Sequence, residues 1–219
     1  MEGAIMIKQA ELILDELTAR YPVLQPVRGD IAAAYEILKE CYDGDHKLLI
    51  AGNGGSCADS EHIVGELMKG FRKSRPLSEE QKKAIAEFDP DHDLSWTGKL
   101  QQGLQAIALT GHPALSTAFA NDVDADYIFA QQVLGYGRPG DVFLGITTSG
   151  NSRNILKAAA VAKAAGMKVI GLTGRDGGRL NAAADLMIIV PEQETFKIQE
   201  LHLPVYHALC LMLEETYFG

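Results

Sequence analysis

The sequence predicts an α/β fold in which a parallel sheet is covered by helices on both faces. Three observations lead to this prediction. Short apolar runs alternate along the chain with segments of helical length, and these runs are apolar throughout, as is typical of strands buried on both faces. Two of the runs end in loops rich in Gly, Ser and Thr that precede a helix, the usual layout of a ligand site in such a sheet.

Five apolar runs are the predicted strands, at residues 46–51, 105–110, 141–146, 167–172 and 186–190. Helices are expected between them, from Ser56 to about residue 71, at 113–121 and 127–136, and from Ser152 to 165. This alternation of strand and helix is the pattern of a parallel sheet.

Helices are also expected at both ends of this unit. The segment 1–45 contains two of them, at about 4–19 and 30–42, and one long apolar helix follows at about 197–217. No linker or repeat separates these parts, and 219 residues is the size of one large domain. We therefore expect a single domain over residues 1–219.

One connection is unusually long. Residues 78–103 separate the first two predicted strands and contain the charged run Ser-Glu-Glu-Gln-Lys-Lys. Connections of this length exceed the usual loop and are typically functional or peripheral. The segment is interpreted as either a lid or a surface excursion.

Composition excludes several classes of protein. The chain has 20 Lys and Arg against 29 Asp and Glu, for a net charge of −9, which argues against binding to nucleic acid or to an anionic membrane. No apolar run approaches the ~18 residues that would span a bilayer, and the first residues lack the order of a signal peptide. The three cysteines, at 41, 57 and 210, are odd in number and widely spaced, as expected of free thiols. We expect a cytoplasmic protein.

The two Gly/Ser loops indicate a site for a phosphate monoester. Converging backbone N–H groups, a helix N-terminus and hydroxyl side chains all favour an anion at such a place. The hydroxyl side chains are those of Ser56, Thr147, Thr148, Ser149 and Ser152. Ordinary helix capping is the alternative interpretation of either loop alone. No Gly-Lys-Ser/Thr follows, so neither loop is a Walker loop.

Four further side chains suit a metal or a proton-transfer reaction. His62 and Glu66 share a helix face, and Gln199 and His207 lie on the last predicted helix. These groups are suitable ligands for zinc, and they also suit enolisation next to a carbonyl. Gln199 and His207 are separated by ~12 Å of helix rise, which a bend at Pro204 would shorten. The alternative is a surface pair and a packed histidine.

Taken together, these motifs resemble the sugar isomerase (SIS) domain family, and within it the isomerases of heptose phosphates. The resemblance rests on residues 52–56, 121–122, 147–152, 172–178 and 198–200, together with His62-x-x-x-Glu66 and His207. It implies a flavodoxin-like three-layer αβα sandwich with a five-stranded parallel sheet, assembled as a homotetramer with sites between subunits. It also implies interconversion of sedoheptulose 7-phosphate and D-glycero-D-manno-heptose 7-phosphate, for precursors of lipopolysaccharide or another surface glycan.

The resemblance further implies roles for individual residues. Glu66 is the expected base and His207 the expected acid, while His62, Glu66, Gln199 and His207 match the zinc ligands of the family. Whether Glu66 is a ligand or a free base stays open. Ser56, Thr147, Ser149 and Ser152 would hold the phosphate and Asn53 and Asp122 the sugar, and the substrate-binding set also includes Gly54, Gly55, Thr148 and Gln199.

Three departures from the family pattern concern the choice of sugar. Lys69 stands one place before the usual arginine, Phe196 replaces a frequent acidic residue, and the segment 78–103 is long. Two other functions therefore remain as alternatives. One is an isomerase of another sugar phosphate, and the other is a non-catalytic SIS protein that binds the replication initiator or senses sugar phosphates. The presence of both Glu66 and His207 favours the enzyme.

Overall fold

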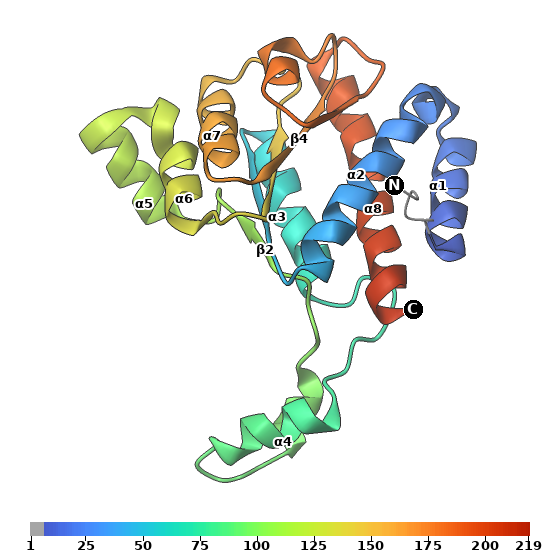
Figure 1. Cartoon of the computed structure of the whole chain (residues 1–219), viewed down its shortest axis with the longest axis vertical. Helices are drawn as coiled ribbons and strands as arrows, with labels where there is room; N and C mark the ends of the chain where they lie inside the picture. The colour runs from blue at the N-terminus through green and yellow to red at the C-terminus, as the bar shows by residue number, and fades with distance from the viewer. Residues whose placement is uncertain (1–6) are drawn as a thin grey trace.

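The structure, a computed structural model, describes residues 7–219 and contains the predicted parallel sheet. Residues 1–6 lie outside the described residues. They include the start of the helix expected from residue 4 and the residues that were expected to lack the order of a signal peptide. Five parallel strands lie in the order β2-β1-β3-β4-β5 (Figure 1). They are β1 (Leu48–Gly52), β2 (Ala106–Ala108), β3 (Val142–Ile146), β4 (Lys168–Thr173) and β5 (Leu186–Ile189).

Each predicted strand is confirmed to within a few residues, and so are the main helices. The α-helices are α1 (Lys8–Arg20), α2 (Arg28–Asp43), α3 (Gly55–Met68), α4 (Glu79–Glu87), α5 (Pro113–Phe119), α6 (Ile128–Tyr136), α7 (Arg153–Ala164) and α8 (Thr195–Phe218). Shorter turns are η1 (Pro22–Val27), η2 (Ser95–Lys99), η3 (Ala120–Asp124), η4 (Ala125–Tyr127) and η5 (Gly178–Ala182).

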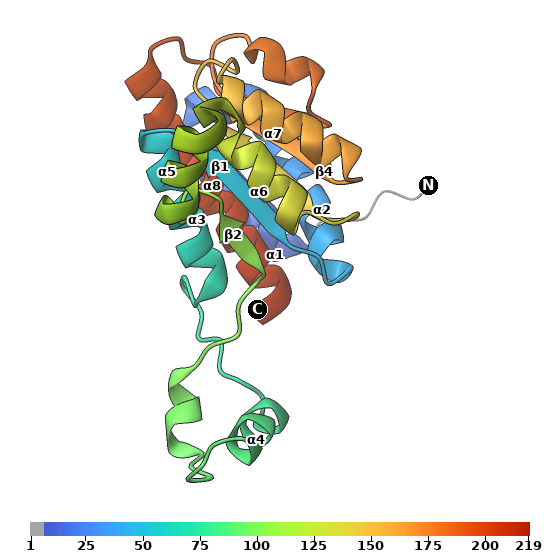
Figure 2. The same cartoon turned by 90° about the vertical axis from the view of Figure 1, so that its left-hand side faces the viewer.

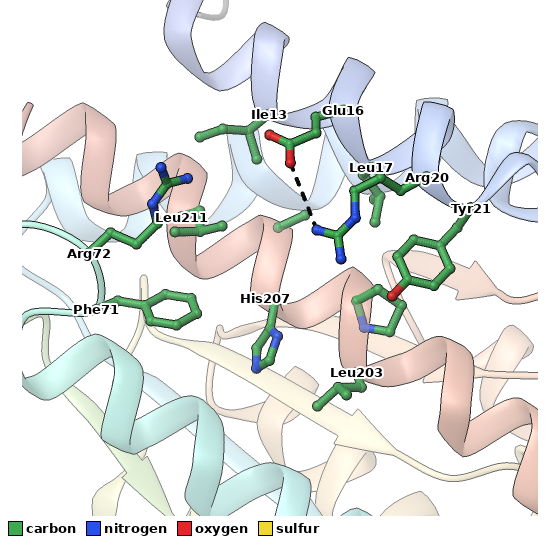
Figure 3. Close-up of a pocket in the computed structure, with 12 residues that line it drawn as sticks. Ile13, Glu16, Leu17, Arg20, Tyr21, Phe71, Arg72, Leu203, His207 and Leu211 are labelled. Carbon is green, nitrogen blue, oxygen red and sulfur yellow. Dashed lines mark ion pairs between the residues drawn. The ribbon is translucent and has the colours of Figure 1, made fainter.

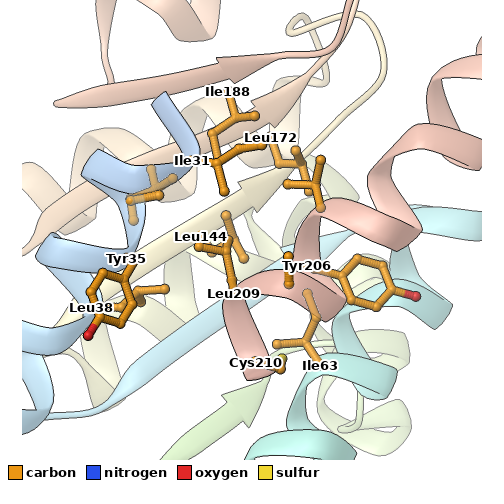
Figure 4. Packing of buried hydrophobic residues seen from close by; sticks show 14 of the residues in the cluster. Ile31, Tyr35, Leu38, Ile63, Leu144, Leu172, Ile188, Tyr206, Leu209 and Cys210 are labelled. Carbon is orange, nitrogen blue, oxygen red and sulfur yellow. The ribbon is translucent and has the colours of Figure 1, made fainter. Parts of the chain in front are cut away.

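Alternate side chains of the strands enter two different cores. Leu48 and Ile50 of β1 belong to a cluster with α1, α2, α3 and α8, in which Leu144, Tyr206 and Leu209 also pack (Figure 4). Leu49 belongs to a second cluster, beneath α6 and α7. Because successive strand residues point to opposite faces, a continuous apolar run is what a sheet covered on both sides requires.

The strand order places the two Gly/Ser loops side by side. β1 and β3 are neighbours in the sheet although β2 lies between them in the chain, and Gly52 pairs with Ile146 at the end of both strands. The chain therefore leaves β1 and β3 at the same level of the carboxyl edge. This is the topological switch point at which open α/β sheets bind ligands.

Helix α3 ends earlier than predicted, at Met68 rather than near residue 71. The backbone N–H groups of Phe71 and Arg72 donate to the carboxylate of Glu214 on α8, at 2.8 Å each. Arg75 completes this arrangement through a 2.8 Å ion pair with Glu214, and both side chains are almost fully buried. A contact with a distant helix thus ends the helical hydrogen bonding, and periodicity alone does not show it.

The long connection forms a separate projection built on α4 and η2. Figures 1 and 2 show it extending away from the body beyond the amino end of β2, whereas the loops after β1 and β3 lie at the opposite end of the sheet. Ser78 and Gln81 form a capping box that begins α4. The projection begins and ends at one place, because Pro76 and Gln101 form an antiparallel bridge.

Within residues 7–219 no helix is both long and apolar enough to cross a bilayer. All three cysteines are free thiols, with Cys41 and Cys210 buried and Cys57 partly exposed.

Candidate active site

The first loop is shaped by glycine where β1 turns into α3. A Cβ on Gly52 would lie 2.3 Å from the carbonyl oxygen of Ser56, so the strand and the first turn of the helix approach too closely for any side chain. Gly54 has a φ of +58°, in the region that glycine favours. As a result Ser56 lies buried in the first turn of α3, next to the N-terminus of that helix.

The second loop follows β3 and holds the remaining hydroxyl groups. The hydroxyl groups of Thr147 and Ser152 are hydrogen-bonded at 2.8 Å across the loop, and Ser152 immediately precedes α7. The backbone N–H of Asn151 donates to the Ser149 hydroxyl at 3.2 Å. Thr147 is buried, and Thr148 and Ser149 are partly exposed. The loop thus presents hydroxyl groups around the N-terminus of α7.

The turn after β4 supports this second loop from behind. A Cβ on Gly150, whose φ is +65°, would lie 1.9 Å from the carbonyl oxygen of Gly177. The N–H of Leu180 donates to the Gly150 carbonyl at 3.0 Å, and that of Gly174 to the Thr148 carbonyl at 3.2 Å. Gly177 and Gly178, within the segment that resembles a family motif, therefore pack closely against the backbone of the second loop.

An amide pair joins the two loops. Asn53 and Asn154 exchange hydrogen bonds, with Asn53 Nδ2 donating to Asn154 Oδ1 at 3.0 Å and Asn154 Nδ2 donating to Asn53 Oδ1 at 2.9 Å. Sequence reasoning named Asn53 but missed Asn154. The signal was its place in the first turn of a helix that follows a Gly/Ser loop.

Asp122 lies in a third segment, the turn η3, where it is exposed and accepts a hydrogen bond from Asn121 at 2.8 Å. The same segment is joined to the start of α7 by an ion pair of 2.6 Å between Asp126 and Arg153. Asp122 is thus carried on a segment beside the second loop.

Helices α3 and α8 bring three of the predicted side chains together. His62 Nε2 is 3.1 Å from Glu66 Oε1, and the rings of His62 and His207 are 4.9 Å apart, edge to face. Burial, with a smaller contribution from His62, lowers the pKa of His207 below its ordinary value, which favours the neutral imidazole. Three of the side chains that the sequence analysis singled out thus lie in contact with one another, while their catalytic and metal-binding roles stay predictions.

Polar atoms of this cluster lack partners in the chain. Glu66 Oε2 and His207 Nε2 are buried without a hydrogen bond. Lys69 Nζ, 3.5 Å from Glu66 Oε2, is too distant for a good one. Buried polar atoms are nearly always satisfied, so two unpartnered polar atoms in one cluster indicate a place for a ligand. A carboxylate oxygen and an imidazole nitrogen are chemically suitable ligands for zinc.

Gln199 lies elsewhere along α8. Its amide nitrogen is 2.6 Å from where a Cβ of Gly55 would be, so it contacts the start of α3 rather than His62. Helix α8 runs continuously through Pro204, and it does not fold back to join Gln199 to His207. Within the part of the chain that the structure describes, no three His, Cys, Asp or Glu side chains are arranged to hold a metal ion. Gln199 is instead placed beside the first loop, near Ser56.

A cavity of about 270 Å³ opens next to His207, between α1 and α8 (Figure 3). Phe71 packs on the His207 ring at 5.4 Å between centroids, and Arg20 and Arg72 also line the cavity. The charged groups at its wall are two arginines and Glu16, whose carboxylate pairs with Arg20. His207 is therefore reachable from this cavity on one side and touches His62 on the other.

Two more residues of the cluster were missed by sequence reasoning. The Tyr206 hydroxyl lies 3.0 Å from His62 Nδ1 and donates to Asp59 Oδ1 at 3.2 Å. The available signals were the spacing of Asp59 and His62, three apart on one helix face, and the position of Tyr206 next to His207.

The chain is similar to known proteins over most of its length. Residues 98–174 match the model of the SIS domain. The chain is 37% identical over 210 residues to the phosphoheptose isomerase of Trichlorobacter lovleyi, which covers 96% of this chain and 94% of that protein. The chain belongs to the phosphoheptose isomerase family.

Solved structures in that family have the same fold. The phosphoheptose isomerase from Francisella tularensis superposes with a TM-score of 0.74 at 31% identity, covering 94% of this chain and 95% of that one. The phosphoheptose isomerase GmhA from Neisseria gonorrhoeae gives a TM-score of 0.70 at 32% identity, covering 94% and 98%. The three-layer αβα sandwich predicted from the sequence is thus the fold of this family.

Proposed function

We propose that the protein interconverts sedoheptulose 7-phosphate and D-glycero-D-manno-heptose 7-phosphate through an enediol. The broader activity, isomerisation of a phosphorylated sugar, follows from its membership of the phosphoheptose isomerase family. The proposal adds the identity of the sugar, the mechanism and the roles of individual residues.

One observation supports the proposal most strongly. Glu66 and His207 come from different helices and meet at His62, and each has a buried polar atom without a partner. A carboxylate beside a neutral imidazole is a suitable pair for moving protons between adjacent carbon and oxygen atoms. A purely structural cluster would have satisfied these atoms within the chain.

The two loops would bind the phosphate. Ser56, Thr147, Ser149 and Ser152 are the proposed donors, with Thr148 and the backbone of Gly54 and Gly55 beside them. Their hydroxyl groups and the N-termini of α3 and α7 favour a dianion without a charged side chain. Asn53, Asp122 and Gln199 would contact the sugar hydroxyl groups.

The proton transfers would then follow from position. Glu66 takes a proton from C1 of the ketose while His207 gives a proton to the oxygen on C2, which produces the enediol. Glu66 returns its proton to C2, and His207 takes back the proton of the oxygen on C1, which leaves the aldehyde. A neutral His207 donates its N–H without being a strong acid, which agrees with its lowered pKa.

His62, Glu66, His207 and Gln199 are the proposed zinc ligands. His62 contacts both Glu66 and His207, whereas Gln199 lies near Gly55, so the described residues are not yet arranged around one metal position and would have to move to bind it. Bound by these residues, zinc would polarise the carbonyl oxygen of the sugar.

The same proposal includes the assembly and the place of the protein. We expect a homotetramer in the cytoplasm, with sites completed between subunits. Its product would be used for surface glycans.

The experiment follows the reaction in deuterated water. Purified protein is incubated with sedoheptulose 7-phosphate, with and without zinc, and the product is observed by NMR. We expect an aldoheptose 7-phosphate labelled with deuterium at C2. Glu66→Gln should lower kcat by about 10²–10⁴-fold and leave sugar phosphate binding in place.

A matched control is Glu40→Gln, which changes an exposed carboxylate on α2 and should keep full activity. Folded protein that neither converts nor exchanges sedoheptulose 7-phosphate would refute the proposed reaction. If that protein still bound the sugar phosphate, a regulatory role would replace it.

A further inference from the structure

A second cavity, the neck cavity, lies where the projection joins the body of the molecule. One of its walls is formed by residues of the segment 70–76, which leads from α3 into the projection, and the other by the segment 98–101, which returns from it. Its volume is about 340 Å³, at the lower end of the range for small-molecule sites. The long connection between β1 and β2 therefore supplies one wall of a space large enough for a small ligand.

The charged side chains that line the neck cavity are all cationic. They are Arg72 and Lys73 on one wall and Lys99 on the other, and of the described lining residues none is acidic. The Ser74 hydroxyl lies beside them. Lys73 pairs with Glu215 at 2.8 Å, whereas in the described part of the chain the side chains of Arg72 and Lys99 form no ion pair. Three cations around one cavity, in a chain with a net charge of −9, indicate an anionic ligand.

Hydrogen bonds within the chain hold both walls in place. The N–H groups of Phe71 and Arg72 donate to the Glu214 carboxylate at 2.8 Å each, which fixes the first wall on α8. The N–H of Gly70 donates to Gln101 Oε1 at 2.7 Å, which joins the first wall to the second. Because both walls are fixed before a ligand arrives, little ordering of the backbone opposes binding.

The placement of the cations indicates the class of ligand. Arg and Lys bind phosphate groups through charge-assisted hydrogen bonds, and cations on two facing walls favour a ligand with a negative group for each wall. The cavity is open at Gly98, where no atom lies within 4 Å of an added Cβ. A long polyanion such as nucleic acid would extend beyond the cavity and meet the net negative charge of the chain.

We propose that the neck cavity binds a small metabolite with more than one phosphate group, held between Arg72 and Lys73 on one wall and Lys99 on the other. The loops after β1 and β3 lie at the opposite end of the sheet, so this is a second anion site, separate from the one proposed for the sugar phosphate (Figures 1 and 2). The inference goes beyond the proposed function and does not depend on it.

The test uses the whole protein, with inorganic pyrophosphate as the probe. Trp96 is the only tryptophan in the sequence and lies in the same short turn, η2, as Lys99, so its fluorescence reports on the neck cavity rather than on the loops. Pyrophosphate should change this fluorescence until the site is saturated. Lys99→Gln should weaken the binding at least about fivefold, since it removes a charge-assisted hydrogen bond from one wall. Arg72→Gln should weaken it from the other wall.

Lys83→Gln is the matched control, because it removes an exposed cation from α4 of the same projection, outside the neck cavity. Its affinity for pyrophosphate should equal that of the parent protein. Three results would overturn the inference: no change of Trp96 fluorescence with pyrophosphate, the same affinity in Lys99→Gln as in the parent protein, or an equal loss in Lys83→Gln. Equal affinities for pyrophosphate and inorganic phosphate would overturn the assignment to a ligand with more than one phosphate group.

Discussion

The two Gly/Ser loops and the α3–α8 helix pair supply the site in different ways. In the loops, position comes from the backbone, because Gly52 and Gly150 lie so close to neighbouring carbonyl groups that a side chain would displace them. In the helix pair, position comes from side chains, through the buried ion pair of Arg75 with Glu214 and the hydrogen bonds of Tyr206. The loops should therefore respond to added volume, and the helix pair to the loss of a single polar group.

Arg75→Met should have the largest effect, because it leaves the Glu214 carboxylate buried without its cation. Breaking a buried pair in this way costs about 3–5 kcal/mol of unfolding free energy. Urea denaturation measures it. Arg20→Met is the matched control, since the ion pair of Arg20 with Glu16 is exposed and should contribute less than about 1 kcal/mol. Equal effects of the two variants would remove the distinction between the helix pair and an ordinary surface.

His202, on the same helix, should make stability depend on pH. Burial lowers the pKa of His202 to about 4, while in the unfolded chain it has its ordinary value of about 6.5. Between these values the unfolded state binds the extra proton, so the unfolding free energy falls as the pH falls, by up to about 3 kcal/mol in all. Urea denaturation at pH 7 and at pH 4.5 should show a smaller loss for His202→Leu than for the parent protein, whereas parallel losses would contradict the prediction.

Gly150→Ala tests the loops. Residue 150 has a φ of +65°, and an added Cβ would lie 1.9 Å from the carbonyl oxygen of Gly177. The substitution should therefore lower the free energy of unfolding by at least about 2 kcal/mol and displace the second loop. We expect a markedly higher KM for the sugar phosphate, measured by the NMR assay. Gly29→Ala is the control, because no atom lies within 4 Å of its Cβ and α2 should gain up to about 1 kcal/mol.

Asn154→Ala should have the smallest effect. It removes the two hydrogen bonds with Asn53, a net loss of about 1 kcal/mol, and should raise KM about fivefold with kcat little changed. Initial rates over a range of substrate concentrations separate the two constants. Asn181→Ala, at an exposed position on η5, provides the comparison, and an equal change there would show that the link between the loops is unimportant.

The same contrast explains what the sequence could predict. The strands and both loops could be predicted from local patterns. The residues of β1 and β3 are apolar throughout, and each strand is followed directly in the sequence by its loop rich in Gly, Ser or Thr. The contact of His62 with His207 depends on how α3 and α8 are aligned, and the sequence suggested it through family resemblance rather than spacing. The position of Gln199 could not be predicted from a bend at Pro204, because neighbouring packing lets α8 continue through that residue.

Other features have no local signal. Glu214 and Arg75 are 139 residues apart, and nothing around either residue shows that they form a buried pair. Asp59 and Tyr206 lie on two different helices, and which of their residues face each other depends on packing throughout the core. Side-chain networks between distant elements cannot be predicted from one sequence, because each partner alone resembles an ordinary surface or core residue.

The bridge between Pro76 and Gln101 determines where insertions and deletions in the chain would be tolerated. The N–H of Gln102 donates to the Arg75 carbonyl at 2.7 Å, so the chain leaves the body and returns to it at the same point. The number of residues between Pro76 and Gln101 therefore does not affect the sheet. Since closing a longer loop costs little extra entropy, this junction is a place where segments can be exchanged, lengthened or removed while the rest of the domain stays intact.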